Sequence, residues 1–236
     1  MISHFMKAAA QLGDPRLRRV LVISVALSLL VFIALWVGLW FLVTVIPPDA
    51  IPGLQWMQET LGQFFDWLAG FLFVGMLLLL TLMLFPAVVT IIVGFFLDEV
   101  ADAVEARHYP GLPTARDISV SETVFEAVKF ALLVLALNLF ALPFYALLFF
   151  VPPLNLVLFY LLNGYLVSRE YFEMVAVRRV EPKAVRRLRR GHRGRLQLAG
   201  MALVLLMTIP ILNLLTPVLA TAFMVHVYQN LPSRET

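Results

Sequence analysis

Four long stretches of this chain carry no Asp, Glu, Lys or Arg, and they constrain its fold more than any other feature. They are Val20–Ile46, Leu68–Leu97, Phe130–Ser168 and Leu196–Leu231. All 18 Lys and Arg and all 15 Asp and Glu residues lie outside them. A helix that crosses a bilayer needs about 20 apolar residues, so each stretch is long enough to lie in lipid. In lipid a helix satisfies its own backbone polar groups. The sequence therefore predicts an all-α integral membrane protein.

The composition supports this assignment and excludes other classes. Hydrophobic residues make up 61% of the chain and charged residues 14%, whereas soluble domains are about 45–50% apolar and about 25% charged. A soluble globular enzyme and a disordered chain are both excluded. Because the chain has no cysteine, it has no disulfide framework, no thiolate metal site and no cysteine nucleophile.

The first two uncharged stretches each read as one long transmembrane helix, over residues 20–46 and 68–97. The last two are interrupted by prolines: Pro152 and Pro153 in the third, Pro210 and Pro217 in the fourth. Because the residue before a proline avoids the helical region, each stretch should bend there. The resulting arms are short for crossing a bilayer. We therefore expect two partly inserted helical hairpins, over 130–168 and 196–231.

The distribution of charge predicts an orientation. The stretch 169–195 holds ten Lys and Arg, and residues 1–19 are also basic, whereas 47–67 has acids and no bases. By the positive-inside rule the two basic segments are cytoplasmic and 47–67 is outside. We expect a single membrane domain over 1–236, with 98–129 and 169–195 as cytoplasmic helical segments. The basic run in 169–195 has two interpretations. It sets the cytoplasmic orientation and contacts anionic lipid head groups, or it attracts an anion.

The start of the first long helix is the most informative local pattern. Asp14-Pro15 is typical of a helix start, with Asp as the N-cap and Pro at the first helical position. Arg16, Arg18 and Arg19 then fall in the first turn. Free backbone N–H groups together with arginines can bind an anion. The alternative is that these arginines anchor the helix at the cytoplasmic face of the membrane.

Polar residues near the proline bends and after the third stretch are candidates for a polar path. Asn155 and Asn213 lie at the two bends, and Asn163 precedes a charged group in which Arg169 and Glu173 are four residues apart. Charges near a membrane usually face the protein interior or a wet cavity, although an interfacial helix end explains them equally well. The amides could also hold helices together.

Motifs for other chemistry are missing from the sequence. The four histidines are scattered without a zinc-binding spacing, and no phosphate-binding loop or nucleophile elbow occurs. The acids within Phe95–Glu105 indicate a helix with one solvated acidic face. We therefore expect no enzyme activity, no catalytic residues, no cofactor and no metal. The basic run has no interleaved aromatics, which argues against nucleic-acid binding.

Several segments together resemble the CysZ-type sulfate permeases, in the etoposide-induced-protein-like membrane family. The resemblance rests on Pro15–Arg19, on Phe96–Glu105, on Asn163–Glu173 and on the two proline-centred bends. It implies a multi-pass protein of the bacterial inner membrane that forms homo-oligomers and mediates sulfate uptake for cysteine biosynthesis. It also implies two long transmembrane helices and two partly inserted hairpins.

The resemblance further implies which residues bind sulfate and which line or gate its path. Leu17, Arg18 and Arg19 match the family's sulfate-binding motif, and Arg16 stands where the family has glycine. The residues expected to line or gate the path are Asn155, Asn163, Arg169, Glu170 and Asn213. The expected partners are sulfate or a related oxyanion, and membrane lipids. The alternative is a non-transporting membrane scaffold or lipid-interacting protein of the same fold, favoured by the basic run and by Arg16.

Overall fold

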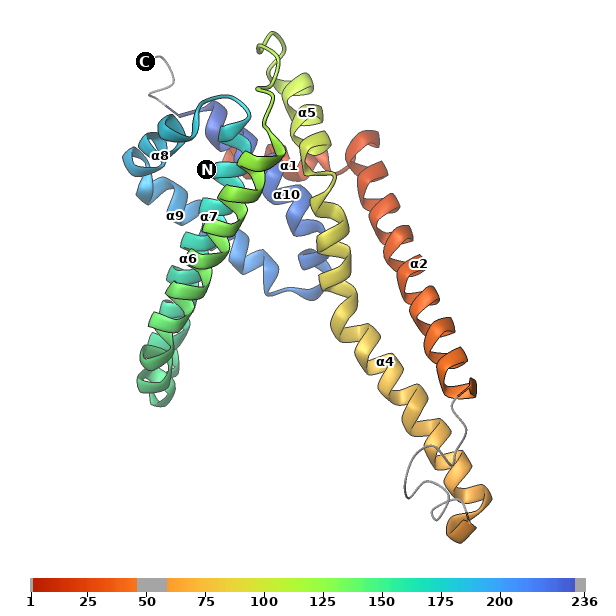
Figure 1. Cartoon of the computed structure of the whole chain (residues 1–236). Helices are drawn as coiled ribbons and strands as arrows, with labels where there is room; N and C mark the ends of the chain where they lie inside the picture. The colour runs from red at the N-terminus through yellow and green to blue at the C-terminus, as the bar shows by residue number, and fades with distance from the viewer. Residues whose placement is uncertain (1, 46–58, 232–236) are drawn as a thin grey trace. The chain divides into compact units, whose positions relative to one another are not determined.

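The structure is a computed structural model that describes residues 2–45 and 59–231, and every regular element in them is a helix (Figure 1). The elements are α1 (Ile2–Gln11), α2 (Pro15–Val45), α4 (Gln63–Gly94), α5 (Leu97–His108), α6 (Val120–Leu147), the short 3-10 helix η2 (Leu148–Phe150), α7 (Pro152–Val177), α8 (Pro182–Gly191), α9 (Arg193–Met207) and α10 (Pro210–Gln229). The all-α class is therefore confirmed. Most of the segment 47–67, which was predicted to be outside, lies beyond the described residues.

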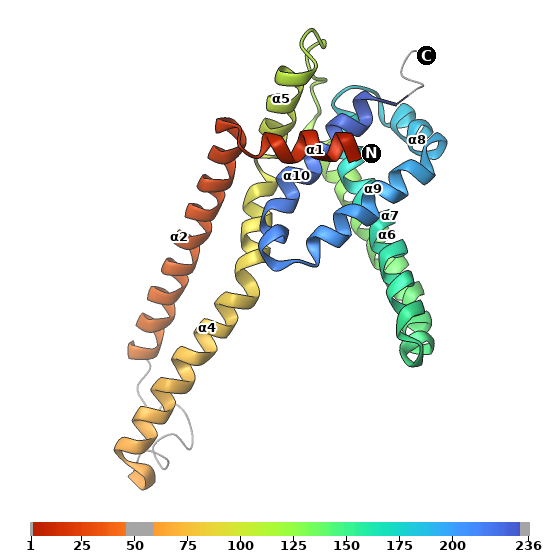
Figure 2. The ribbon, with the colours of Figure 1, turned by 180° about the vertical axis from the view of Figure 1, so that it is seen from behind.

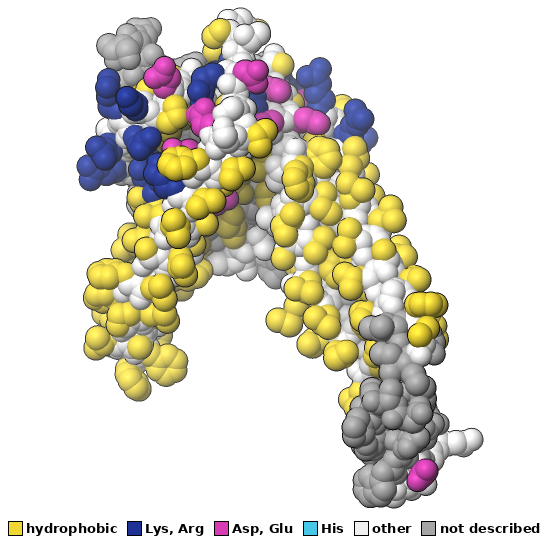
Figure 3. Space-filling model, viewed as in Figure 1, with side chains coloured by type: hydrophobic (Ala, Val, Ile, Leu, Met, Phe, Trp, Pro, Cys, Tyr) yellow, Lys and Arg dark blue, Asp and Glu magenta, His cyan; other side chains and the backbone are white. Residues whose placement is uncertain are grey.

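The helices divide into two compact units, Arg19–Phe95 and a larger unit of Met1–Arg18 with Phe96–Thr236. The smaller unit contains most of α2 and all of α4, the two long helices that the sequence predicts. They are joined by a hydrogen bond from Trp36 Nε1 to Thr81 Oγ1 of 2.9 Å and by a tilted contact of the Phe32 and Phe85 rings, with centroids 5.8 Å apart. Most of their apolar side chains point outward (Figure 3). Such a surface is stable in lipid and unstable in water.

Within the described residues, four helical segments are long and apolar enough to cross a membrane, twice the number of full spans expected. They are Pro15–Phe41, Trp67–Gly94, Val120–Phe150 and Leu212–Gln229. In the last segment 72% of the residues are buried inside the protein, whereas in the most apolar part of Val120–Phe150 only 6% are buried. By length and composition α6 is thus a further candidate for crossing the bilayer. The depth to which either hairpin inserts stays a prediction.

The first predicted hairpin is formed by α6 and α7, which lie side by side in both views (Figures 1 and 2). The chain reverses through η2, and α7 begins at Pro152, where a proline needs no N–H partner. Its arms of 28 and 26 residues are longer than expected, because the helices continue into flanking segments that carry charges. Asn155 closes the bend by donating to the Tyr145 carbonyl oxygen at 3.5 Å.

The second hairpin is formed by α9 and α10, which bend at Thr208 and Ile209, just before Pro210. The predicted bend at Pro217 is wrong, because α10 runs through this residue. A proline inside a helix removes one backbone hydrogen bond. Here the surrounding packing outweighs that loss, since every residue from Thr216 to Gln229 is buried.

Helix α10 forms the centre of the larger unit, and α1, α5, α7 and α9 all pack against it. The sequence reading did not predict α1 as a helix. Its Ala8 is fully buried, and its Phe5 ring contacts the edge of Phe223 at a centroid distance of 5.9 Å. Helix α1 is therefore held by its apolar side rather than by its basic residues.

Helices α7 and α9 cross at two glycines. A methyl group added at Gly164 would lie 2.6 Å from Met201 Cγ and 3.0 Å from the Met201 nitrogen. One added at Gly200 would collide with the carbonyl oxygen of Gly164. Small residues permit close backbone approach between helices in membranes. This crossing requires glycine on both sides.

We expect Gly200→Ala to destabilise the protein by about 1–3 kcal/mol or more, because the clash is with backbone that cannot move aside. Gly75→Ala in α4 is the matched control, since open space surrounds that position. Thermal unfolding in detergent measures both. A Gly200→Ala variant as stable as the control would contradict the close crossing.

Candidate functional site

The start of α2 has the local structure predicted for it. The Asp14 carboxylate accepts a 2.9 Å hydrogen bond from the Arg16 N–H, and the Asp14 carbonyl accepts one from the Arg18 N–H. Pro15 occupies the first helical position. These are the contacts of an N-cap aspartate, which satisfies N–H groups that the helix itself leaves unpaired.

A cation from α5 joins this helix start. Arg107 Nη1 donates to Asp14 Oδ2 at 2.8 Å. The hydrogen bond from the Arg16 N–H holds the pKa of Asp14 below its usual range, and the bond from Arg107 adds to this effect. Asp14 is therefore charged at neutral pH. An anion that binds here must share these donors with a carboxylate already in place.

The predicted anion-binding residues differ in exposure. Arg16, Arg18 and Arg19 have exposed side chains, while the Leu17 side chain is fully buried. The Arg16 and Arg18 N–H groups already donate to Asp14. The first turn thus presents guanidinium groups outward, while the N–H group of Leu17 is buried with the rest of that residue, which is 0% exposed. Anion binding by these residues stays a prediction.

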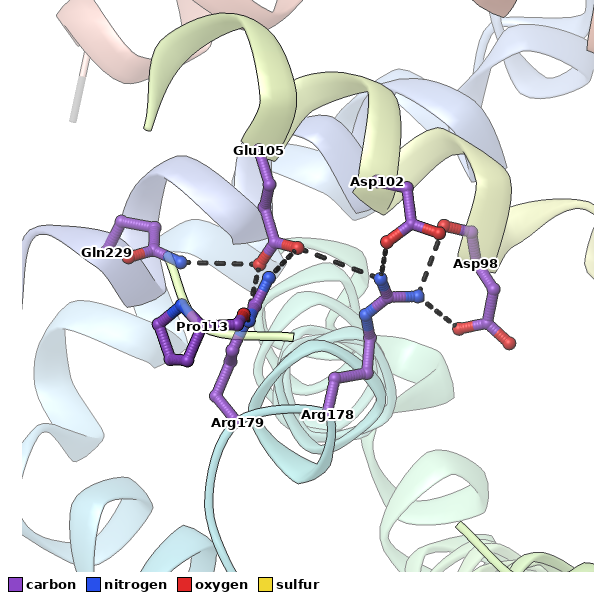
Figure 4. Close-up of polar contacts among 7 residues, drawn as sticks. All are labelled: Asp98, Asp102, Glu105, Pro113, Arg178, Arg179 and Gln229. Carbon is purple, nitrogen blue, oxygen red and sulfur yellow. Dashed lines mark hydrogen bonds and ion pairs between the residues drawn. The ribbon is translucent and has the colours of Figure 1, made fainter. Parts of the chain in front are cut away.

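Sequence reasoning missed Arg107, which lies 93 residues from its partner. It is positioned by a charged network that ties α5 to the end of α7 (Figure 4). Arg178 donates to Asp98 Oδ1 at 2.7 Å and also contacts Asp102. Arg179 Nε donates to Glu105 Oε1 at 3.0 Å. The network fixes the α5 helix that carries Arg107.

Glu105 is the buried centre of this network, with 4% of its side chain exposed. It accepts from Arg179 and, at 3.3 Å, from Gln229 of α10. The prediction that the acids of this segment form one solvated face is therefore wrong for Glu105, although Asp98 and Asp102 are exposed. The reason is that Glu105 lies on the side of α5 that packs against α10.

Burial and charge act in opposite directions on Arg178. Burial alone would lower the pKa of its guanidinium, but the hydrogen bond to Asp98 and the charges of Asp102 and Glu105 outweigh it and raise the pKa. A buried cation is tolerated when carboxylates surround it in this way. The arrangement is typical of a structural ion-pair network that joins α5 to the end of α7, rather than of a binding site.

Of the residues predicted to line a path, Arg169 has the most developed surroundings. It is buried, donates from Nε to Glu173 Oε1 at 3.0 Å, as the spacing predicted, and lies over the Phe130 ring. Glu170 is exposed on the same helix. In the described part of the chain, no hydrogen bond or ion pair joins Arg169 or Glu170 to any of the predicted amides.

Those amides make local contacts. Asn163 donates to the Phe159 carbonyl at 2.9 Å, one helical turn away, and Asn155 bonds across the hairpin bend. Asn213 is half-buried in the first turns of α10. Their part in a path stays a prediction.

We expect Glu105→Gln to lower the free energy of unfolding by about 3–5 kcal/mol, because it leaves Arg179 buried without its charge partner. Glu126→Gln is the control, since Glu126 pairs with Lys129 at the surface and exposed pairs contribute about 0–1 kcal/mol. Chemical unfolding in detergent compares them. Equal losses would show that the network does not stabilise the fold.

We expect Asp14→Asn to tighten sulfate binding by about two- to fivefold, the effect of one charge near a helix start. Asparagine still caps the helix, so only the charge is removed. Asp117→Asn is the control, because Asp117 is exposed and lies outside the helix start that holds Asp14. Equilibrium binding of radiolabelled sulfate gives the readout. Unchanged affinity would place the anion elsewhere.

One known protein family matches most of the chain. A sequence model of the family described as "Sulfate transporter CysZ/Etoposide-induced protein 2.4" matches residues 4–217. A comparison with curated proteins gives no match. The family match covers most of the 236 residues and extends from α1 into α10, so it includes the helix start and the arginines and carboxylates of the charged network. The chain therefore belongs to the sulfate transporter CysZ/etoposide-induced protein 2.4 family.

Proposed function

We propose that this protein is a sulfate permease of the bacterial inner membrane, which admits sulfate or a related oxyanion for cysteine biosynthesis. The observation that carries the proposal is the family match over residues 4–217. The family is one of transporters, which favours transport over catalysis. Helices long and apolar enough to cross a membrane support the same conclusion.

In this proposal the start of α2 captures the anion. The exposed guanidinium groups of Arg16, Arg18 and Arg19 attract and bind the dianion. Leu17 is fully buried, so its N–H donates to the anion only after the first turn opens. Arg107 pairs with the Asp14 carboxylate and reduces its repulsion of an incoming anion. Arg16, in place of the family's glycine, adds a cation.

Beyond the capture point, we assign the path to polar residues of the hairpins and their continuation. They are Asn155, Asn163, Arg169, Glu170 and Asn213. A homo-oligomer assembled in the lipid bilayer would bring several such paths together. Because the sequence has no ATP-binding loop, we propose that flux follows a gradient.

The second candidate function is a lipid-interacting scaffold without transport. It is favoured by α8, a short helix with basic side chains at Lys183, Arg186, Arg187, Arg189 and Arg190. Val185 anchors this helix in the core, while Lys183 and Arg187 are exposed. Cations near a membrane surface gain about 1 kcal/mol each from anionic lipid.

Radiolabelled sulfate flux into liposomes separates the two functions. We expect saturable flux with the purified protein and its loss in the double variant Arg18→Ala/Arg19→Ala. The matched control is Lys183→Ala/Arg187→Ala, which removes the same charge from α8. We expect this control to keep its flux.

The possible results test anion capture at the start of α2 separately from sulfate transport. Equal flux in all three proteins would retain the permease and refute capture at α2. No flux from a folded wild-type protein, together with binding to anionic liposomes that the Lys183→Ala/Arg187→Ala variant loses, would favour the scaffold.

A further inference from the structure

Residues of helices α7, α8 and α9 line an open cavity of about 600 Å³. Binding sites for small organic molecules commonly have volumes of about 300–1,000 Å³. Four arginines from the three helices line this cavity: Arg169, Arg189, Arg190 and Arg193. Lys and Arg side chains gather over α8 in Figure 3. The cavity is thus large enough for an organic ligand and is strongly basic.

The floor of the cavity is fixed by contacts. Arg169 is 8% exposed and bonds to Glu173. Arg189 Nη1 donates to the Tyr165 hydroxyl at 3.0 Å, and its guanidinium lies over the Tyr165 ring. Arg189 Nε lies 3.1 Å from Glu173 Oε1 but makes no hydrogen bond. The floor therefore combines two preorganised cations paired with Glu173 and an aromatic ring.

The mouth of the cavity has cations without carboxylate partners. Arg190 and Arg193 are exposed, and within residues 2–45 and 59–231 neither forms an ion pair. Glu173 is the single described carboxylate that pairs with any of the four arginines. Cations held together without counter-charges repel one another. An anionic ligand would relieve this repulsion.

The start of α9 adds backbone donors at the same place. Arg193 and Gly194, its first two residues, line the cavity. No side chain caps this helix start, and space around Gly194 is open. Uncapped N–H groups and the positive end of the helix dipole favour a bound phosphate or sulfate group.

We propose that this cavity binds a phosphate or sulfate monoester, with the dianionic group against Arg190, Arg193 and the start of α9. The organic part would lie against Tyr165 and Leu196, which also line the cavity. Such an ester is either a soluble molecule or the head group of a lipid. The site uses none of the residues at the start of α2. The cavity shares Arg169 with the proposed path, but ester binding is measured without a gradient, so its failure is distinguishable from a failure of transport.

Calorimetry on the full-length protein in detergent tests this with two ligands. Phenyl phosphate is a soluble aromatic monoester, and dihexanoyl phosphatidic acid is a lipid monoester. Methyl phenyl phosphate, a diester with a single charge, is the ligand control. The variants are Arg190→Gln and Arg193→Gln, whose side chains are exposed, so the fold should survive. Arg187→Gln, on the same helix and outside the cavity lining, is the protein control.

We expect each cavity variant to weaken binding of the monoester by about tenfold, the loss of one charge-assisted contact, and Arg187→Gln to have little effect. Binding of phenyl phosphate would identify a soluble ligand, and binding of phosphatidic acid alone would identify a lipid. The proposal is overturned if neither binds, if Arg187→Gln weakens binding equally, or if the diester binds as tightly. Inorganic sulfate competing as well as phenyl phosphate would overturn the assignment to an ester.

Discussion

The crossing of α7 and α9 at Gly164 and Gly200 is the contact on which the larger unit depends. With no side chain between them, the two backbones approach closely enough for α10 to pack against both. The same approach brings the start of α9 and the end of α8 alongside α7. Arginines distant in sequence thereby reach one cavity. Because neither glycine has a side chain, the close crossing determines both the packing of the core and the positions of these arginines.

Two groups of arginines lie along or just beyond helix α7, and their surroundings differ in charge balance. At its C-terminal end, Arg178 and Arg179 meet three carboxylates of α5. Farther back along the helix, Arg169 belongs to a set of four arginines that line one cavity, of which Arg169 and Arg189 pair with Glu173. The first group is neutralised within the protein, as a buried structural network must be. The second has an excess of positive charge, which makes it fit for an external anion.

The sequence predicts the parts of this fold that depend on local chemistry. Uncharged stretches identify the long helices, Asp14-Pro15 locates the start of α2, and Pro152 locates the hairpin bend. What it cannot predict depends on contacts between distant segments. In the sequence Glu105 resembles a surface acid, because only the packing of α10 buries it. No sequence pattern links Arg107 to Asp14, its ion-pair partner. Similarly, α1 is too short to be recognised without the helix on which it packs.

Pro217 within α10 gives the second hairpin an uneven stiffness. Because Pro217 has no N–H, the Asn213 carbonyl lacks its usual helical donor, and one backbone hydrogen bond of α10 is missing. On one side of this gap the helix is buried; on the other, Leu212 to Leu215 are only half-buried. The gap therefore separates an anchored segment from one held by fewer neighbours. The tip of this hairpin can tilt about Pro217 while the core that supports it keeps its packing.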